Sequence, residues 1–108
     1  MVKKVYFEDI EPGFRLPKLV KHPTTRQLVM WAGASEDFTE LHYDKDYTTK
    51  LGLPNLIVHG QLTAAILVQL ITDWMGELGT FKKLTVRFQN MFLVNNDIIC
   101  QGEVKKIY

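Results

Sequence analysis

A predominantly apolar run in the middle of the chain, Leu62 to Ile71, most constrains the fold. Its apolar residues recur at steps of three and four, as on one face of a helix, and most positions between them are apolar too. We therefore expect a helix from near Gly60 to about Gly76 or Gly79, buried on nearly all sides. A membrane span needs roughly 18 or more apolar residues, so the run predicts a core helix without membrane insertion.

The residues after this helix predict the layer that covers it. The sequence K-L-T-V-R-F-Q at 83–89 alternates between polar and apolar residues, the period of a half-buried strand. Leu84, Val86 and Phe88 are expected to face the helix. Asn95 to Asp97 predicts a turn, and Ile98 to Tyr108 a second strand. The predicted fold class is α+β, an antiparallel sheet wrapped around one long apolar helix.

The first half of the chain carries turn and cap signals. Glu11-Pro12-Gly13 predicts a tight turn before an extended segment at 14–20. Thr24 precedes Gln27 by three residues, which is capping-box spacing, and Gln27 to Ala34 reads as a helix with Leu28, Trp31 and Ala32 on one face. Asp44 is expected to cap a short helix through Lys50, which Gly52 and Pro54 end.

The size and charge of the chain exclude several classes of protein. Its 108 residues predict one domain, 1–108. A formal charge of +1 provides no electrostatic basis for binding nucleic acid or acidic lipid. The single cysteine, Cys100, excludes an internal disulfide and a cysteine zinc site, and we expect it in the core. Met1 to Glu8 lacks the apolar stretch of an export signal, so a cytoplasmic location is expected.

Asp37 and His42 form the first candidate for chemistry, in S-E-D-F-T-E-L-H. On a helix, five residues would separate them by about 140°, so they can cooperate only if the segment is a loop. Ser35, Asp37 and Thr39 all compete with the backbone for hydrogen bonds, which permits a loop. A capping Asp beside a surface His is the alternative interpretation.

His59 and Gly60 form the second candidate, in L-I-V-H-G-Q-L at the start of the long helix. Backbone N–H groups at a helix N-terminus lack partners and carry partial positive charge, which suits an anion or a developing oxyanion. Glycine lets a substrate carbonyl approach the backbone closely. Alternatively, Gly60 only breaks the loop, and His59 is a partly buried histidine with satisfied hydrogen bonds.

Together these motifs resemble the MaoC-like dehydratases, the hot-dog-fold group that includes the (R)-specific enoyl-CoA hydratases. Ser35, Asp37 and His42 match that family's S-x-D-x-N-P-x-H signature, and Ile57, His59 and Gly60 match a segment similar to P-I-x-H-G. F-E-D-I-E-P-G at 7–13 is similar to the family's opening strand and turn. V-N-N-D-I-I at 94–99 is similar to its V-x-x-G-D turn.

The resemblance implies a hydratase or dehydratase acting on a 2-enoyl or 3-hydroxyacyl thioester. Asp37 and His42 would activate water, and the Gly60 N–H would hold the oxyanion. Ser35, Thr39 and His59 would bind substrate or support the loop. A cleft beside the long helix would take the acyl chain. No cofactor or metal is implied, because CoA or a carrier-protein pantetheine enters as part of the thioester substrate.

The sequence also departs from the family pattern. Thr39 and Glu40 stand where Asn and Pro are usual, and Val68 where related hydratases can place a Ser. We expect the chain to lack the last two family strands, either natively or because the sequence is truncated. If they are lacking natively, the cover for the long helix is expected from a homo-oligomer or a hetero-oligomer with another hot-dog chain. A non-catalytic subunit or acyl-CoA-binding module, and an acyl-CoA thioesterase, are the alternative functions.

Overall fold

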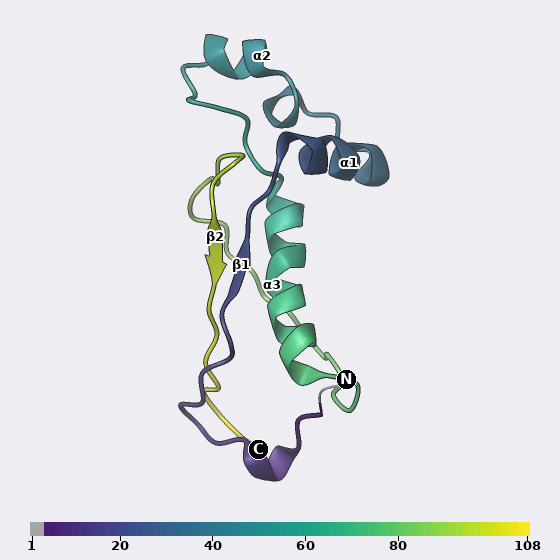
Figure 1. The fold of residues 1–108 in the computed structure, drawn as a ribbon, viewed down its shortest axis with the longest axis vertical. Coiled ribbons are helices and arrows are strands. Elements are labelled where there is room, and N and C mark those ends of the chain that lie inside the picture. Colours follow the sequence, from purple (N-terminus) through teal and green to yellow (C-terminus); the bar gives the residue numbers. More distant parts are fainter. Residues whose placement is uncertain (1–3) are drawn as a thin grey trace.

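A single long helix, α3 (Gly60–Met75), is the main axis of the molecule (Figure 1). The computed structural model describes residues 4–108, so the first three residues of the Met1–Glu8 segment lie outside the described part. Gly76 ends the helix with a positive φ of 69°, a backbone conformation that favours glycine. The predicted helix and its end at Gly76 are confirmed. No helix in the described part of the chain is long and apolar enough to cross a bilayer.

Two shorter helices, α1 (Thr25–Ser35) and α2 (Lys45–Lys50), gather beyond the N-terminal end of α3 (Figure 1). The side chain of Thr24 accepts a hydrogen bond from the Gln27 N–H, and Asp44 accepts one from the Tyr47 N–H. Each cap therefore satisfies a backbone donor that a helix start leaves free. Both predicted helices are confirmed. A 3-10 turn, η2 (Glu40–His42), lies between them.

Two strands, β1 (Leu19–Lys21) and β2 (Ile98–Cys100), pair antiparallel alongside α3 (Figure 1). Leu19 lies opposite Cys100 in this register. Beyond the strands, the Leu16 N–H donates to the Gly102 carbonyl and the Val104 N–H donates to the Phe14 carbonyl, so the pairing continues. The second strand is therefore shorter than the predicted 98–108, although its turn is as expected, with Asn95 at φ 64°.

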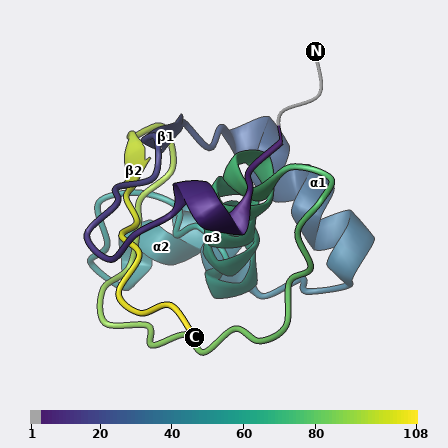
Figure 2. The same cartoon turned by 90° about the horizontal axis from the view of Figure 1, so that it is seen from below.

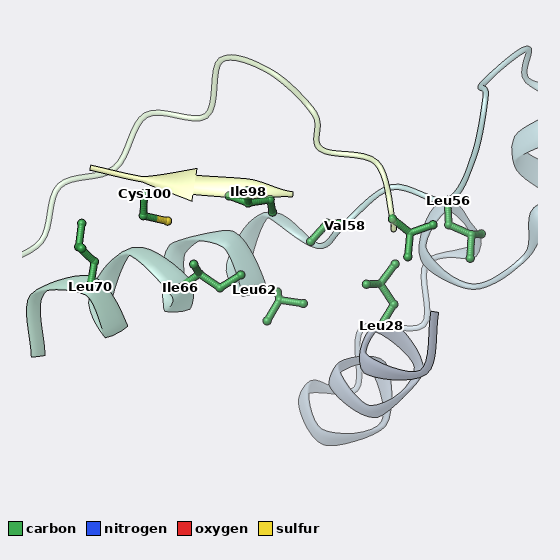
Figure 3. Packing of buried hydrophobic residues seen from close by; sticks show 9 residues of the cluster. Leu28, Leu56, Val58, Leu62, Ile66, Leu70, Ile98 and Cys100 are labelled. Atoms are coloured by element: carbon green, nitrogen blue, oxygen red, sulfur yellow. The ribbon is translucent and has the colours of Figure 1, made fainter. Parts of the chain in front are cut away.

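The core lies between α3 and β2 (Figure 3). Ile98 and Cys100 of β2 point toward Ile66 and Leu70 of α3. Leu28 of α1 extends this cluster past the start of α3. Burial raises the pKa of the Cys100 thiol, in keeping with the prediction of a core cysteine.

Three predictions about the elements are wrong. The helix is not buried on all sides, because Leu67 is 37% exposed. Residues 83–89 are not a strand, and Leu84 and Phe88 are exposed. Within the described residues, 80–91 make no backbone hydrogen bond, so the alternating pattern has no neighbouring strand to pair with. The segment 7–13 was expected to begin with a strand, but its first three residues form a 3-10 turn, η1 (Phe7–Asp9).

The segment that contains residues 80–91 passes below α3 in Figure 2 and reaches the side of the molecule where β2 lies. Apolar cavities separate it from β2 and the residues that follow β2. One has a volume of about 260 Å³ and lies between Leu67, Phe88 and Ile99. Another, of about 300 Å³, lies between Leu84, Ile71 and Val104. The sheet layer over α3 is therefore open on this side.

Candidate active site

Asp37 and His42 face each other across the start of η2. The loop after α1 turns the two side chains toward one point, with 3.9 Å between Asp37 Oδ2 and His42 Nε2. The His42 side chain is 12% exposed and that of Asp37 is 41% exposed. The loop that their spacing demanded is thus present. Both side chains are partly exposed, so a water molecule can reach the pair.

Two hydroxyl groups hold the Asp37 loop. Ser35 Oγ donates to the Trp31 carbonyl and accepts a hydrogen bond from the Asp37 N–H. Thr39 Oγ1 donates to Asp37 Oδ1 at 2.8 Å, and the Thr39 N–H donates to the same oxygen. The Thr39 hydroxyl is the main cause that lowers the pKa of Asp37. Asp37 is therefore a carboxylate at neutral pH, with Oδ2 free to accept a hydrogen bond.

The other side of the His42 ring is tied to the backbone. His42 Nδ1 lies 2.6 Å from the Ile57 carbonyl oxygen. A carbonyl oxygen only accepts, so Nδ1 carries the proton and donates it. In the neutral ring this leaves a lone pair on Nε2, which faces Asp37. The hydrogen bond therefore fixes the tautomer that has an available base at Nε2.

His59 lies directly against His42. It is 0% exposed, and its ring stacks on that of His42 with the centroids 3.8 Å apart and the planes 21° apart. Neither ring nitrogen of His59 has a hydrogen-bond partner among the described residues. Burial is the main cause that lowers its pKa, and the neighbouring His42 lowers it further. The hydrogen bonds expected in the alternative interpretation of His59 are thus not present among the described residues.

Gly60 is the first residue of α3. Its N–H makes no hydrogen bond to the described residues, as the first turn of a helix allows. A side chain there would meet the Phe88 ring, whose Cε1 lies 3.6 Å from the position of a Cβ. Phe88 thus lies beside Gly60. Phe88 also lines the 260 Å³ cavity, together with Thr63 and Leu67 of α3, whereas Gly60, Asp37 and His42 do not line it.

Asp37, His42 and His59 also form a cluster of metal-ligating residue types. One ligand atom from each lies within 4.8 Å of the others. Two histidines on one ion must direct their in-plane lone pairs to a common point. The lone pairs of two stacked rings run nearly parallel and do not converge. The stacked geometry of the two histidines therefore does not favour metal binding by this cluster.

The comparisons with known proteins identify the family. The model of the MaoC like domain matches residues 9–107. The chain belongs to the MaoC-like domain family. Its fold is accordingly the hot-dog fold predicted from the sequence, with α3 as the central helix.

Several characterised proteins are similar to this MaoC-like chain. The 3-oxo-4,17-pregnadiene-20-carboxyl-CoA hydratase beta subunit of Mycobacterium tuberculosis is 24% identical over 95 residues, 88% of this chain and 74% of that protein. The (R)-hydratase from A. caviae involved in PHA biosynthesis has a TM-score of 0.85 at 24% identity, covering 94% of this chain and 76% of that one. The ChsH1-ChsH2 complex from Mycobacterium tuberculosis has a TM-score of 0.82 at 23% identity, covering 91% and 77%.

Two parts of the site could not be found by motif. The Ile57 carbonyl that orients His42 is a backbone group, and no side-chain pattern predicts its role. The stacking of His59 on His42 depends on how the chain before α3 passes η2. A backbone hydrogen bond from the Ile57 N–H to the Leu41 carbonyl makes this crossing. The number of residues between His42 and His59 does not predict that their rings meet.

Proposed function

We propose that this MaoC-like chain adds water to a 2-enoyl thioester, or removes it from a 3-hydroxyacyl thioester. The observation that carries the proposal is the 3.9 Å separation of Asp37 Oδ2 and His42 Nε2, two atoms that both accept hydrogen bonds. A water oxygen about 2.8 Å from each atom fits between them. Its two O–H groups then point at the dyad, and a lone pair is free to attack the β carbon.

The reaction needs one proton to leave the water and one to reach the α carbon. As the water oxygen bonds to the β carbon, the dyad takes up one of its protons, and the double-bond electrons move toward the thioester carbonyl. The dyad then delivers a proton to the α carbon, so that one water is added in total. General acid–base assistance of this kind typically contributes about 10² to 10⁴ in rate.

The thioester carbonyl would lie at the start of α3. The free Gly60 N–H is the proposed donor to the oxygen that becomes negative, where a preorganised donor contributes about 3 kcal/mol. The acyl chain would enter the neighbouring 260 Å³ cavity between Leu67 and Phe92. CoA or pantetheine would belong to the substrate. Ser35 and Thr39 would support the loop through their contacts with Asp37.

The test follows the ultraviolet absorbance of crotonyl-CoA on mixing with the purified protein. Asp37→Asn and His42→Ala should each lower the rate by at least about 100-fold. Asp73→Asn and His22→Ala are matched controls, because both residues are exposed. His22 bonds to Asp97 and not to the dyad. Hydration that survives both dyad substitutions, or no hydration by the folded protein, contradicts the proposal. Release of free CoA thiol would instead support the thioesterase alternative.

We also propose that the chain functions in an assembly with another hot-dog chain. The similar Mycobacterium tuberculosis protein is named a beta subunit, and a similar solved structure is a complex of two chains. In this chain, the free backbone of residues 80–91 and the 300 Å³ cavity beside Leu84 leave apolar surface for a partner to cover. If the chain is instead a non-catalytic subunit, the crotonyl-CoA assay will be negative until the partner is added.

A further inference from the structure

His59 is the largest polar side chain in the fully buried part of the protein, and it touches the proposed dyad. Both of its ring nitrogens lack partners among the described residues, which is unfavourable for a buried polar group. An apolar residue of similar size would avoid that cost. The position of the ring, stacked on His42, suggests what the imidazole contributes.

The backbone around His59 is held by two other segments. The Ile57 N–H donates to the Leu41 carbonyl, and the Val58 N–H donates to the Phe92 carbonyl. Trp31 of α1 approaches the ring from the side, with the ring centroids 6.5 Å apart. His59 is therefore a fixed surface against which the more exposed His42 ring rests. The Nδ1 hydrogen bond to the Ile57 carbonyl anchors one edge of the His42 ring, and the His59 ring supports one of its faces.

Charge supports the same role. Burial and the neighbouring His42 keep the pKa of His59 low, while the negative charge of Asp37 opposes this shift. His59 is therefore neutral at neutral pH. When His42 takes up a proton, the face of a neutral aromatic ring attracts the new positive charge, whereas a second cationic ring would repel it.

We propose that His59 is a positioning residue, whose neutral, buried ring holds His42 by stacking so that Nε2 faces Asp37 and the water between them. The inference rests on the proposed function of the Asp37–His42 pair. It assigns His59 no contact with the substrate and no proton transfer. The aromatic face, and not the ring nitrogens, is the part that acts on His42.

Two substitutions separate stacking from simple filling of space. His59→Phe keeps a stacked aromatic ring and removes the unpartnered nitrogens, and His59→Leu removes the ring. In the crotonyl-CoA assay we expect His59→Phe to keep kcat within about threefold of the native protein. We expect His59→Leu to lower kcat by 10- to 100-fold, roughly the loss that misplacement of a reacting group causes, with little change in KM.

A second readout does not depend on activity. Nitrogen-15 NMR of the imidazole rings reports which nitrogen of His42 carries the proton. The native protein and His59→Phe should show the proton on Nδ1, and His59→Leu should show a mixture of the two tautomers. If the native protein gives this spectrum but hydrates no enoyl-CoA, the proposed function fails while the role of His59 stands.

Two results would overturn the inference. One is a His59→Leu protein with native kcat and a native His42 spectrum. The other is a folded His59→Phe protein as impaired as His59→Leu, which would place the effect in the nitrogens. If His59→Leu does not fold, His59→Phe alone tests the inference. A folded His59→Phe protein must keep nearly native kcat and the His42 proton on Nδ1, and loss of either contradicts the inference.

Discussion

Thr39 replaces the asparagine usual in this family, yet its hydroxyl still supports Asp37. Because that hydroxyl is the main cause of the lowered pKa of Asp37, Thr39→Val should raise the pKa toward its ordinary value of 3.8. Thr39→Ser keeps the hydroxyl and should leave the pKa nearly unchanged. Carbon-13 NMR of the Asp37 carboxyl during a pH titration measures the shift. Equal titration curves for Thr39→Val and the native protein would refute this role.

His59 predicts how stability depends on pH. Its folded pKa lies below the ordinary 6.5, so the unfolded chain binds more protons than the folded protein once the pH falls below 6.5. The free energy of unfolding should therefore fall on acidification from about pH 6.5, by at most about 1.4 kcal/mol per pH unit, until the pH passes the folded pKa. Above about pH 7.5 this group contributes little pH dependence, because the unfolded state is then also mostly unprotonated.

Denaturant unfolding between pH 5 and pH 7.5 measures this effect. His59→Phe should lose the part of the slope that belongs to His59, and His22→Ala serves as a control for an exposed histidine. The same slope in His59→Phe and the native protein would show that another group is responsible. The carboxylate of Asp37 does not interfere, because its lowered pKa places its own titration below 3.8.

At the scale of the elements, α1 offers a matched pair of neighbouring residues. Leu28 is 0% exposed and belongs to the core, whereas Val29 is 54% exposed. Leu28→Ala should lower the free energy of unfolding by about 2–5 kcal/mol, through lost burial and the cavity left behind. Val29→Ala should change it by less than about 0.5 kcal/mol. Denaturant unfolding measures both, and equal effects would contradict the observed packing of α1.

The elements that could be predicted from the sequence are those with local signals. Thr24 and Asp44 cap their helices within three residues, and Gly76 ends α3 in a conformation that glycine favours. The 83–89 pattern is also local, but a strand needs hydrogen bonds from a neighbour, and none reaches these residues from the described chain. The five-residue spacing of Asp37 and His42 predicted a loop. The stacking of His59 on His42 depends on a tertiary contact between two segments, which residue spacing does not predict.

At the scale of the whole molecule, the shape is extended. The principal extents are 53 × 24 × 23 Å and the radius of gyration is 16.6 Å, against about 13 Å for a compact domain of 100 residues. A chain with exposed apolar residues and unpaired backbone along one flank of its helix gains stability when a partner covers them. We expect the purified protein to have a solution mass above 12.5 kDa.

Light scattering coupled to size exclusion, over a range of concentrations, measures this mass. Leu84→Lys places a charge beside the 300 Å³ cavity and should shift the protein toward the monomer. Val29→Lys, on the exposed face of α1, is the control and should not. A single species of 12.5 kDa at every concentration would contradict the proposed assembly.

The four residues from Ile57 to Gly60 have a practical consequence for redesign. The carbonyl that sets the His42 tautomer, the ring that stacks on His42 and the proposed oxyanion donor follow one another in a single short stretch. A shift of the backbone here would therefore move all three groups together. Leu67 and Phe92 line the proposed acyl cavity outside this stretch. Libraries aimed at a new chain length can vary these two positions while residues 57–60 stay unchanged.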